Sequence, residues 1–216
     1  MPGSPGDHHH HPPGPAGMTQ RIDQVAGVIL AGGRSSRFGS NKALALHQGD
    51  ALIQGIARRL AGLFPETLLI TNTPEEYGFL GWPMTGDRYP GCGPLAGIHA
   101  ALRTVSKPRI FVCGCDMPLV DPVLIRFLCE LDGGHDIVLP WLDEGPEPLY
   151  AVYRTTALPI IEDQLAQKQY KIGRLFDKLR IRKVTAGEIL QILPDLTTFQ
   201  NINHQHDLAR LAAMVQ

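Results

Sequence analysis

The 216-residue sequence has little of what marks several specialised classes of protein. Its four cysteines are too few for a disulfide scaffold, and a zinc site on Cys113 and Cys115 would need a second cysteine pair that the sequence lacks. No run approaches the ~18 apolar residues of a membrane span. The first residues also lack the apolar core of a secretory signal. These absences predict a cytoplasmic protein with no membrane partner.

Neither sign of charge is in excess. The sequence has 20 Lys and Arg against 21 Asp and Glu, which gives a formal net charge of −1. Nucleic-acid-binding proteins usually carry a basic surplus, so we expect no nucleic-acid partner. A polyacidic or disordered chain is equally excluded. The hydrophobic fraction of 44% is ordinary for a globular protein, and the length suits one domain or two small ones.

Glycine and proline are abundant instead, with 23 and 18 residues. This surplus predicts many turns, and glycine-rich turns often bind phosphates. The first 17 residues form a low-complexity segment with four consecutive histidines. Such a segment cannot bury enough apolar area to offset its ordering entropy. We therefore expect a disordered leader or tag over 1–17 and a single domain over 18–216.

From residue 24 onward, strand-like and helix-like apolar patterns alternate. This alternation predicts a three-layer α/β/α domain with a mainly parallel sheet and right-handed crossovers. Asp121 is expected to cap the helix that follows it, and Thr155 or Thr156 to cap another. The strands are expected over 25–30, 68–70, 83–87, 109–115, 136–139, 148–154 and 182–184, and the helices over 52–63, 95–102, 122–131, 155–167, 172–179 and 204–215.

The most informative motif is LAGGRSSRFGSNK, residues 30–42, directly after the first expected strand. Gly32 and Gly33 allow backbone amides to approach an anion closely. Arg37 and Lys42 add two cations to the same loop. These are the parts of a triphosphate site, although the spacing matches neither the Walker pattern nor G-x-G-x-x-G. The alternative is a solvated Gly-Ser-Arg loop.

Carboxylates and a second glycine turn follow later strands. Asp116 ends an apolar strand, where α/β sheets bind ligands, and Mg²⁺ carrying nucleotide phosphates is a natural partner for it. The alternative is a helix-capping Asp. Gly93, in GCGPLAG, precedes a helix whose free N–H groups suit an anion. Asp87 lies in another strand-end loop. For both Gly93 and Asp87, an ordinary turn or surface position is the alternative.

Further polar residues lie in the last third of the sequence. Asn201 and Asn203 alternate in an extended segment before the final helix, and Asn203 is also a candidate helix cap. Arg174, Lys171 and Glu147 are candidate contacts for a second substrate, with ordinary surface charge as the alternative.

Taken together, four motifs resemble those of the molybdenum cofactor guanylyltransferases. They are L-A-G-G-x-S-x-R-F/M-G-x-x-K at 30–42, GPLAGI at 93–98, CDMPL at 115–119 and NIN at 201–203, in that family's order and spacing. The resemblance covers roughly residues 24–214 and implies a Rossmann-like, mainly parallel sheet of the nucleotidyltransferase type. The first motif alone marks only the wider nucleotidyltransferase superfamily. Phe38 replaces the commoner Met conservatively, and Asn41 stands where the family often has Asp.

The resemblance implies a role for each matching residue. Leu30, Ala31, Gly32 and Gly33 would hold a guanine nucleotide through backbone groups, and Lys42 would bind its phosphates. Asp116 would bind Mg²⁺ and the nucleotide, and Asp87 would lie near the nucleotide. Asn72 or its neighbour Thr71 matches an Asn of the family, since the register there is open by one residue. Arg37 would stabilise charge on the departing pyrophosphate.

The implied reaction joins GTP to molybdenum–molybdopterin, giving the guanine dinucleotide cofactor and pyrophosphate. Residues about 24–140 would bind the nucleotide and about 141–216 the pterin, with Asn201, Asn203 and Arg174 as pterin contacts. Further partners implied are molybdoenzymes or their chaperones. The alternatives are a CTP-dependent pterin cytidylyltransferase, a sugar-phosphate nucleotidyltransferase, or a non-catalytic module that delivers the nucleotide or the pterin. Cytidylyl enzymes tend to read L-A-A-G where this sequence has L-A-G-G.

Overall fold

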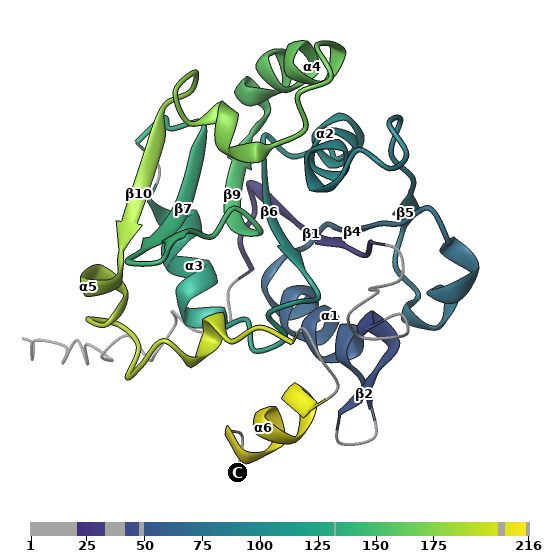
Figure 1. The fold of residues 1–216 in the computed structure, drawn as a ribbon, viewed down its shortest axis with the longest axis vertical. Coiled ribbons are helices and arrows are strands. Elements are labelled where there is room, and N and C mark those ends of the chain that lie inside the picture. Colours follow the sequence, from purple (N-terminus) through teal and green to yellow (C-terminus); the bar gives the residue numbers. More distant parts are fainter. Residues whose placement is uncertain (1–20, 33–41, 48–49, 132, 203–205, 215–216) are drawn as a thin grey trace, which may run out of the picture.

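The computed structural model describes residues 21–32, 42–47, 50–131, 133–202 and 206–214. Its centre is an eight-stranded mixed sheet with the strand order β10-β7-β9-β6-β1-β4-β5, and β8 pairs with β7 (Figure 1). A separate hairpin joins β2 and β3. The strands are β1 (Val25–Leu30), β2 (Leu46–His47), β3 (Asp50–Ala51), β4 (Thr67–Ile70), β5 (Met84–Thr85), β6 (Arg109–Gly114), β7 (Ile137–Leu142), β8 (Gly145–Pro146), β9 (Tyr150–Arg154) and β10 (Ile181–Thr185).

Helices cover both faces of the sheet and bury a separate apolar cluster on each. Leu60 of α1 and Leu128 of α3 belong to the cluster on one face, and Ile98 of α2 and Ile161 of α4 to the cluster on the other. The three-layer α/β/α arrangement expected from the sequence is therefore confirmed. The helices are α1 (Leu52–Leu63), α2 (Pro94–Thr104), α3 (Pro122–Glu130), α4 (Leu158–Ala166), α5 (Ala186–Ile189) and α6 (His206–Met214), with short 3-10 helices at Lys42–Leu44, Pro74–Glu76, Gly78–Leu80, Thr155–Ala157, Ile172–Leu175 and Thr197–Phe199.

Three parallel strands end together at one edge of the sheet. β1 pairs in parallel with β4 and β6, and Leu30 lies opposite both Ile70 and Gly114. β9 runs antiparallel to β6 and β7, so the sheet is parallel at its centre and mixed beyond it. Because parallel strands end at the same edge, the loops after residues 30, 70 and 114 meet there.

Two glycines allow the layers to pack closely around β1. A Cβ on Gly27 would lie 2.5 Å from the Phe64 ring, so only glycine leaves room for the helix-flanking Phe64 against the strand. A Cβ on Gly97 of α2 would lie 3.0 Å from a methyl carbon of Leu30. α2 therefore rests directly on the end of β1, which places its N-terminus beside the edge where the loops after residues 30, 70 and 114 meet.

The chain departs from the sequence-based predictions at two helices. A 3-10 turn at Thr155–Ala157 precedes α4, and neither threonine caps a helix, because the Thr156 hydroxyl donates to Asp136 instead. The helix expected over 172–179 is a 3-10 turn over Ile172–Leu175. Bonds from Phe176 N to Gly173 O and from Lys178 N to Leu175 O continue a tight winding that has no α-helical register. The cap by Asp121 is confirmed, since its side chain accepts from Val123 N at 2.8 Å.

The segment after α5 crosses back beneath the sheet toward the end of β6. The hydroxyl of the buried Tyr150 lies 2.8 Å from both Asp121 N and Thr198 Oγ1, and Thr198 Oγ1 lies 2.8 Å from Leu119 O. Ile202 then packs with Leu211 of α6 and Leu52 of α1. Within the described residues, no helix combines the length and apolar character needed to cross a membrane.

Candidate active site

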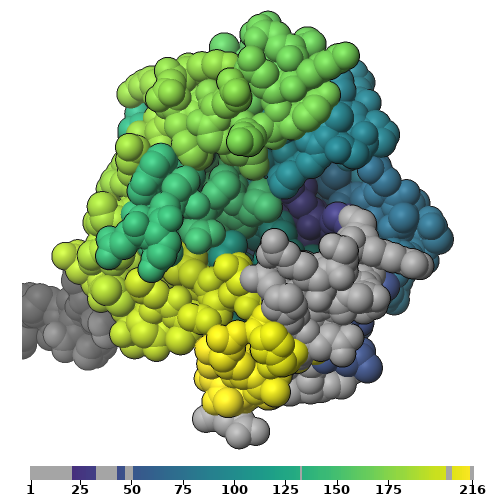
Figure 2. Space-filling view, viewed as in Figure 1, coloured from purple at the N-terminus to yellow at the C-terminus, as the bar shows by residue number. Residues whose placement is uncertain are grey.

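A cleft of about 590 Å³ lies at the edge where β1, β4 and β6 end, within the size range of small-molecule sites. In the space-filling view, the purple surface of the β1 region lies in a hollow of this face (Figure 2). Most of the residues proposed from the sequence gather around this one cleft. They are Leu30, Ala31, Gly32, Asn72, Asp87, Gly93 and Asp116.

Four other residues predicted from the sequence lie wholly or partly outside the described part of the chain. Gly33, Arg37 and Asn203 lie outside the described residues. Lys42 begins the first 3-10 helix, and its neighbour Ala43 lines the cleft, but the Lys42 side chain lies outside the described part of the chain. The phosphate-binding roles of Arg37 and Lys42 therefore remain predictions.

Asn72 and Asp87 are joined by two hydrogen bonds on one wall of the cleft. The Asn72 amide donates from Nδ2 to Asp87 Oδ2 at 3.2 Å, and Asp87 N donates to Asn72 Oδ1 at 3.2 Å. Tyr89 N donates to the other carboxylate oxygen, Oδ1, at 2.9 Å. These bonds fix the plane of the Asp87 carboxylate, yet both its oxygens retain lone pairs for a ligand.

Thr71, Thr73 and Glu76 are linked by a series of hydrogen bonds at the same wall. Thr71 is buried, with 4% of its surface exposed, and both Thr71 and Thr73 line the cleft. Their hydroxyl oxygens lie 3.3 Å apart, and Thr73 N donates to Thr71 Oγ1 at 3.0 Å. The Thr73 hydroxyl donates to Glu76 Oε2 at 3.0 Å, although Glu76 itself does not line the cleft.

The opposite wall is the glycine turn that opens α2. Gly91 and Gly93 both have φ of 78°, a conformation that favours glycine. Pro94 occupies the first turn of α2, and Gly93, Pro94 and Gly97 line the cleft. The N-terminus of α2, the positive end of its dipole, thus lies at the cleft, an arrangement suited to an anion.

Asp116 follows the end of β6 and lines the floor of the cleft. Its backbone carbonyl accepts from Ile202 N at 2.7 Å, so the segment that carries Asn201 is joined to the strand end. Burial raises the pKa of the Cys113 thiol in β6 well above its usual value, which disfavours its nucleophilic thiolate form.

The residues at the cleft fit a hard divalent cation held mainly by its substrate. Within the described residues, no group of three or more His, Cys, Asp or Glu could enclose a metal ion. Mg²⁺ commonly needs only one or two protein carboxylates because phosphates and waters complete its shell. Asp116, an oxygen donor on the cleft floor, meets that requirement.

A second cavity of about 560 Å³ lies between the β7–β8 hairpin and the C-terminal segment. Asn201 lines it, together with Glu147, His206, Asp207 and Arg210. Asp207 is 4% exposed and is bonded to the Arg210 guanidinium. Burial raises the pKa of Glu147, with a further contribution from Glu144.

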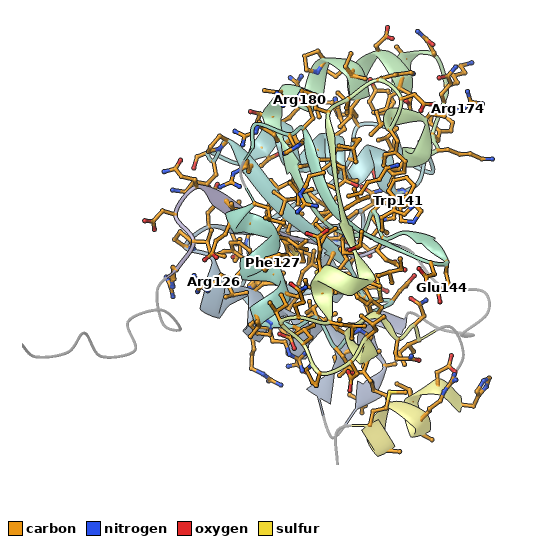
Figure 3. All side chains as sticks on the ribbon, turned by 90° about the vertical axis from the view of Figure 1, so that its left-hand side faces the viewer. Arg126, Phe127, Trp141, Glu144, Arg174 and Arg180 are labelled. Atoms are coloured by element: carbon orange, nitrogen blue, oxygen red, sulfur yellow. The ribbon has the colours of Figure 1, made fainter. Side chains whose placement is uncertain are left out.

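Arg174 lies elsewhere. It is exposed in the 3-10 turn Ile172–Leu175 and lines neither cavity, and Figure 3 shows it well apart from Glu144 at the second cavity. Its role as a pterin contact remains a prediction.

Sequence reasoning overlooked several residues of the two cavities. Thr73 and Leu149 line the cleft without belonging to any motif. Asp207 and Arg210 line the second cavity, and their spacing of three residues on an amphipathic helix was the available signal. The sequence left open whether Thr71 or Asn72 matches the Asn of the family, and both residues line the cleft.

Comparisons with known proteins agree with this geometry. Residues 27–184 match the family described as the MobA-like NTP transferase domain. The chain is 34% identical over 199 residues to the molybdenum cofactor guanylyltransferase of Desulfosudis oleivorans, covering 90% of this chain and 98% of the relative. It is 36% identical over 195 residues to a probable molybdenum cofactor guanylyltransferase of Pelotomaculum thermopropionicum, covering 89% and 94%.

Among solved structures, the molybdopterin-guanine dinucleotide biosynthesis protein A of Archaeoglobus fulgidus matches with a TM-score of 0.78 at 27% identity, covering 88% of this chain and 98% of that one. A CMP:2-keto-3-deoxy-manno-octonic acid synthetase shares the fold, with a TM-score of 0.65 at 14% identity. The sequence matches extend over most of the chain and include the strands whose ends form the cleft. The chain therefore belongs to the family of MobA-like nucleotidyltransferases.

Proposed function

We propose that this protein transfers GMP from GTP to molybdenum–molybdopterin, forming the guanine dinucleotide cofactor and releasing pyrophosphate. The names of its relatives and the family match support this reaction. The observation that carries the choice of nucleotide is the fixed Asp87 carboxylate on the cleft wall.

Asp87 suits guanine because of the hydrogen-bonding pattern of that base. Guanine presents two adjacent donors, N1–H and the 2-amino group, and a carboxylate accepts two parallel donors well. Cytosine and adenine present an amino group beside an acceptor nitrogen, so one oxygen of Asp87 would face another acceptor. A site built to accept two such donors discriminates against a base that lacks one of them. The cleft therefore favours GTP over CTP and ATP.

The phosphates would lie between the glycine turn of α2 and the loop after β1. N–H groups at the N-terminus of α2 would bind phosphate oxygens, and Arg37 and Lys42 would neutralise charge on the departing pyrophosphate. Asp116 would hold Mg²⁺, which supplies charge neutralisation at the phosphate oxygens when bound.

The second cavity would hold the pterin. Asn201 lines that cavity, and the next residue, Ile202, donates its N–H to the carbonyl of Asp116, which lines the first cleft, so one backbone bond links the two sites. The terminal phosphate oxygen of the pterin would attack the α-phosphorus of GTP as the bond to the β-phosphate oxygen breaks. Positioning and charge neutralisation then account for catalysis, with no covalent enzyme intermediate. Asn203 and Arg174 would add pterin contacts.

A nucleotide-binding panel in Mg²⁺ tests the choice of base. GTP should bind more tightly than CTP or ATP, and Asp87→Asn should remove most of that preference. Asp177→Asn, which neutralises an exposed carboxylate outside both cavities, is the control. Equal affinity for GTP and CTP would overturn the proposal in favour of a cytidylyl enzyme.

Pyrophosphate release tests the reaction. Release should require GTP and molybdenum–molybdopterin together. If both ligands bind tightly but no pyrophosphate is released, the protein is a delivery module rather than an enzyme.

A further inference from the structure

The side-chain hydrogen bonds that link Thr71, Thr73 and Glu76 have a fixed direction from donor to acceptor. A carboxylate at neutral pH only accepts, so the contact of 3.0 Å between Thr73 Oγ1 and Glu76 Oε2 uses the single proton of the Thr73 hydroxyl. In the 3.3 Å contact between the two threonine hydroxyls, Thr71 must therefore be the donor. The proton of the Thr71 hydroxyl therefore points toward Thr73 Oγ1, in the direction of Glu76.

This direction determines what Thr71 can offer to a ligand. A hydroxyl has one proton and two lone pairs. At Thr71 the proton is given to Thr73 Oγ1, and one lone pair accepts the N–H of Thr73 at 3.0 Å. One lone pair is left on the hydroxyl of this residue, which lines the cleft. Thr71 is thus an acceptor for ligands, although a threonine hydroxyl is ordinarily able to donate or accept.

We propose that Glu76 is a positioning residue for nucleotide specificity: through Thr73 it holds Thr71 as an acceptor for an N–H or O–H donor of the bound nucleotide. The inference rests on the proposed function, because it assumes that a guanine nucleotide occupies the cleft. The 2-amino group of guanine carries two N–H bonds, of which Asp87 would take one. Thr71 would take the other.

The effect of removing Glu76 follows from the same reasoning. In Glu76→Ala the Thr73 hydroxyl loses its acceptor and becomes free to donate to Thr71. The Thr71 proton is then released and can turn toward the cleft. Nucleotides without this donor should bind the parent protein more weakly than GTP does. In Glu76→Ala the difference in affinity between these nucleotides and GTP should be smaller. One neutral hydrogen bond corresponds to a change of about two- to tenfold.

The measurement is the ratio of dissociation constants of ITP and GTP, with 2′-deoxy-GTP and GTP as a second arm. ITP lacks the 2-amino group, and 2′-deoxy-GTP lacks a ribose hydroxyl. The ITP ratio should fall about two- to tenfold in Glu76→Ala. A fall confined to the 2′-deoxy-GTP ratio would assign the donor to the ribose and would leave the role of Glu76 in place.

Matched variants separate this effect from charge and from folding. Glu75→Ala removes the neighbouring carboxylate of the same 3-10 helix, which is exposed, and should leave both ratios unchanged. Glu76→Gln removes the same charge as Glu76→Ala but keeps an acceptor oxygen, so it should retain the parent ratios. Thr73→Val should reproduce Glu76→Ala, and Thr73→Ser should not.

Two results would overturn the inference. One is a uniform loss of affinity for all nucleotides in Glu76→Ala, with both ratios constant, which is what a purely structural role predicts. The other is an equal change of the ratios in Glu75→Ala, which would make charge the cause. Failure of the proposed function would look different, because the parent protein itself would then show no preference for GTP over CTP.

Discussion

Tyr150→Phe should destabilise the protein through two buried hydrogen bonds. Tyr150 is fully buried, and Thr198 gives its own proton to Leu119 O, so the tyrosine hydroxyl donates to Thr198 and accepts from Asp121 N. Removing one oxygen atom leaves the Asp121 N–H and a Thr198 lone pair without these partners, while the aromatic ring and its packing remain.

The expected loss can be estimated from these two bonds. A buried group left without its partner costs about 1–3 kcal/mol. For a domain of this size the loss should lower the melting temperature by roughly 3–10 °C. Burial raises the pKa of Tyr150 above its usual value, so the hydroxyl stays protonated at neutral pH and the effect should not depend on pH there.

Tyr153→Phe is the matched control on the same strand. Tyr153 is also fully buried, but its hydroxyl makes one bond, to Pro148 O at 2.6 Å. A carbonyl tolerates partial satisfaction better than an N–H, so this variant should lose less stability. Thermal and urea unfolding of both variants beside the parent measure the difference, with equal urea m-values expected.

A melting temperature of Tyr150→Phe within error of the parent would refute this reasoning. A larger loss in Tyr153→Phe would refute it as well. Because Thr198 lies on the segment that carries Asn201, Tyr150→Phe should also raise KM for the pterin more than KM for GTP.

Three further predictions concern the cleft and the sheet edge. Asp116→Asn should abolish most Mg²⁺-dependent pyrophosphate release while keeping the parent melting curve, and near-normal turnover would remove Asp116 from the metal site. Gly86→Ala places a Cβ 2.7 Å from Asn72 Oδ1 and should displace Asn72 from Asp87, so titration should show GTP binding weakened about tenfold with little change in melting. The Arg182 guanidinium and Thr185 N lower the pKa of Glu188 from 4.5 to about 2. Its stabilising contribution is therefore complete above pH 4.5 and lost as pH falls toward 2, and urea unfolding of Glu188→Gln should show a smaller acid-induced loss than the parent.

Local sequence patterns predicted the elements that depend on nearby residues. The apolar run at Val25–Leu30 indicated a buried strand, and the amphipathic spacing at Leu52–Leu63 indicated a helix. Asp121 was identified as a cap because capping is a contact between residues two or three positions apart. The cleft residues were predictable as a group because each follows a strand whose end lies at the same edge.

Contacts between distant segments were not predictable in this way. Thr156 is diverted from capping by Asp136, a contact that depends on the arrangement of β7 and β9. The pairing of Asn72 with Asp87 joins two loops and has no signature in either one. The second cavity likewise depends on how the C-terminal segment lies against the β7–β8 hairpin.

The bond between Ile202 and Asp116 also bears on the order in which the protein folds. β1, β4 and β6, with the glycine turn of α2, all lie within residues 25–114, so most of the cleft can assemble from contacts of modest sequence separation. The backbone bond at Asp116 forms only after residue 202 has been synthesised. A nascent chain that stops before this residue would hold the walls of the cleft but lack this backbone bond, so the end of β6 is joined to the later segment only after the rest of the cleft has been synthesised.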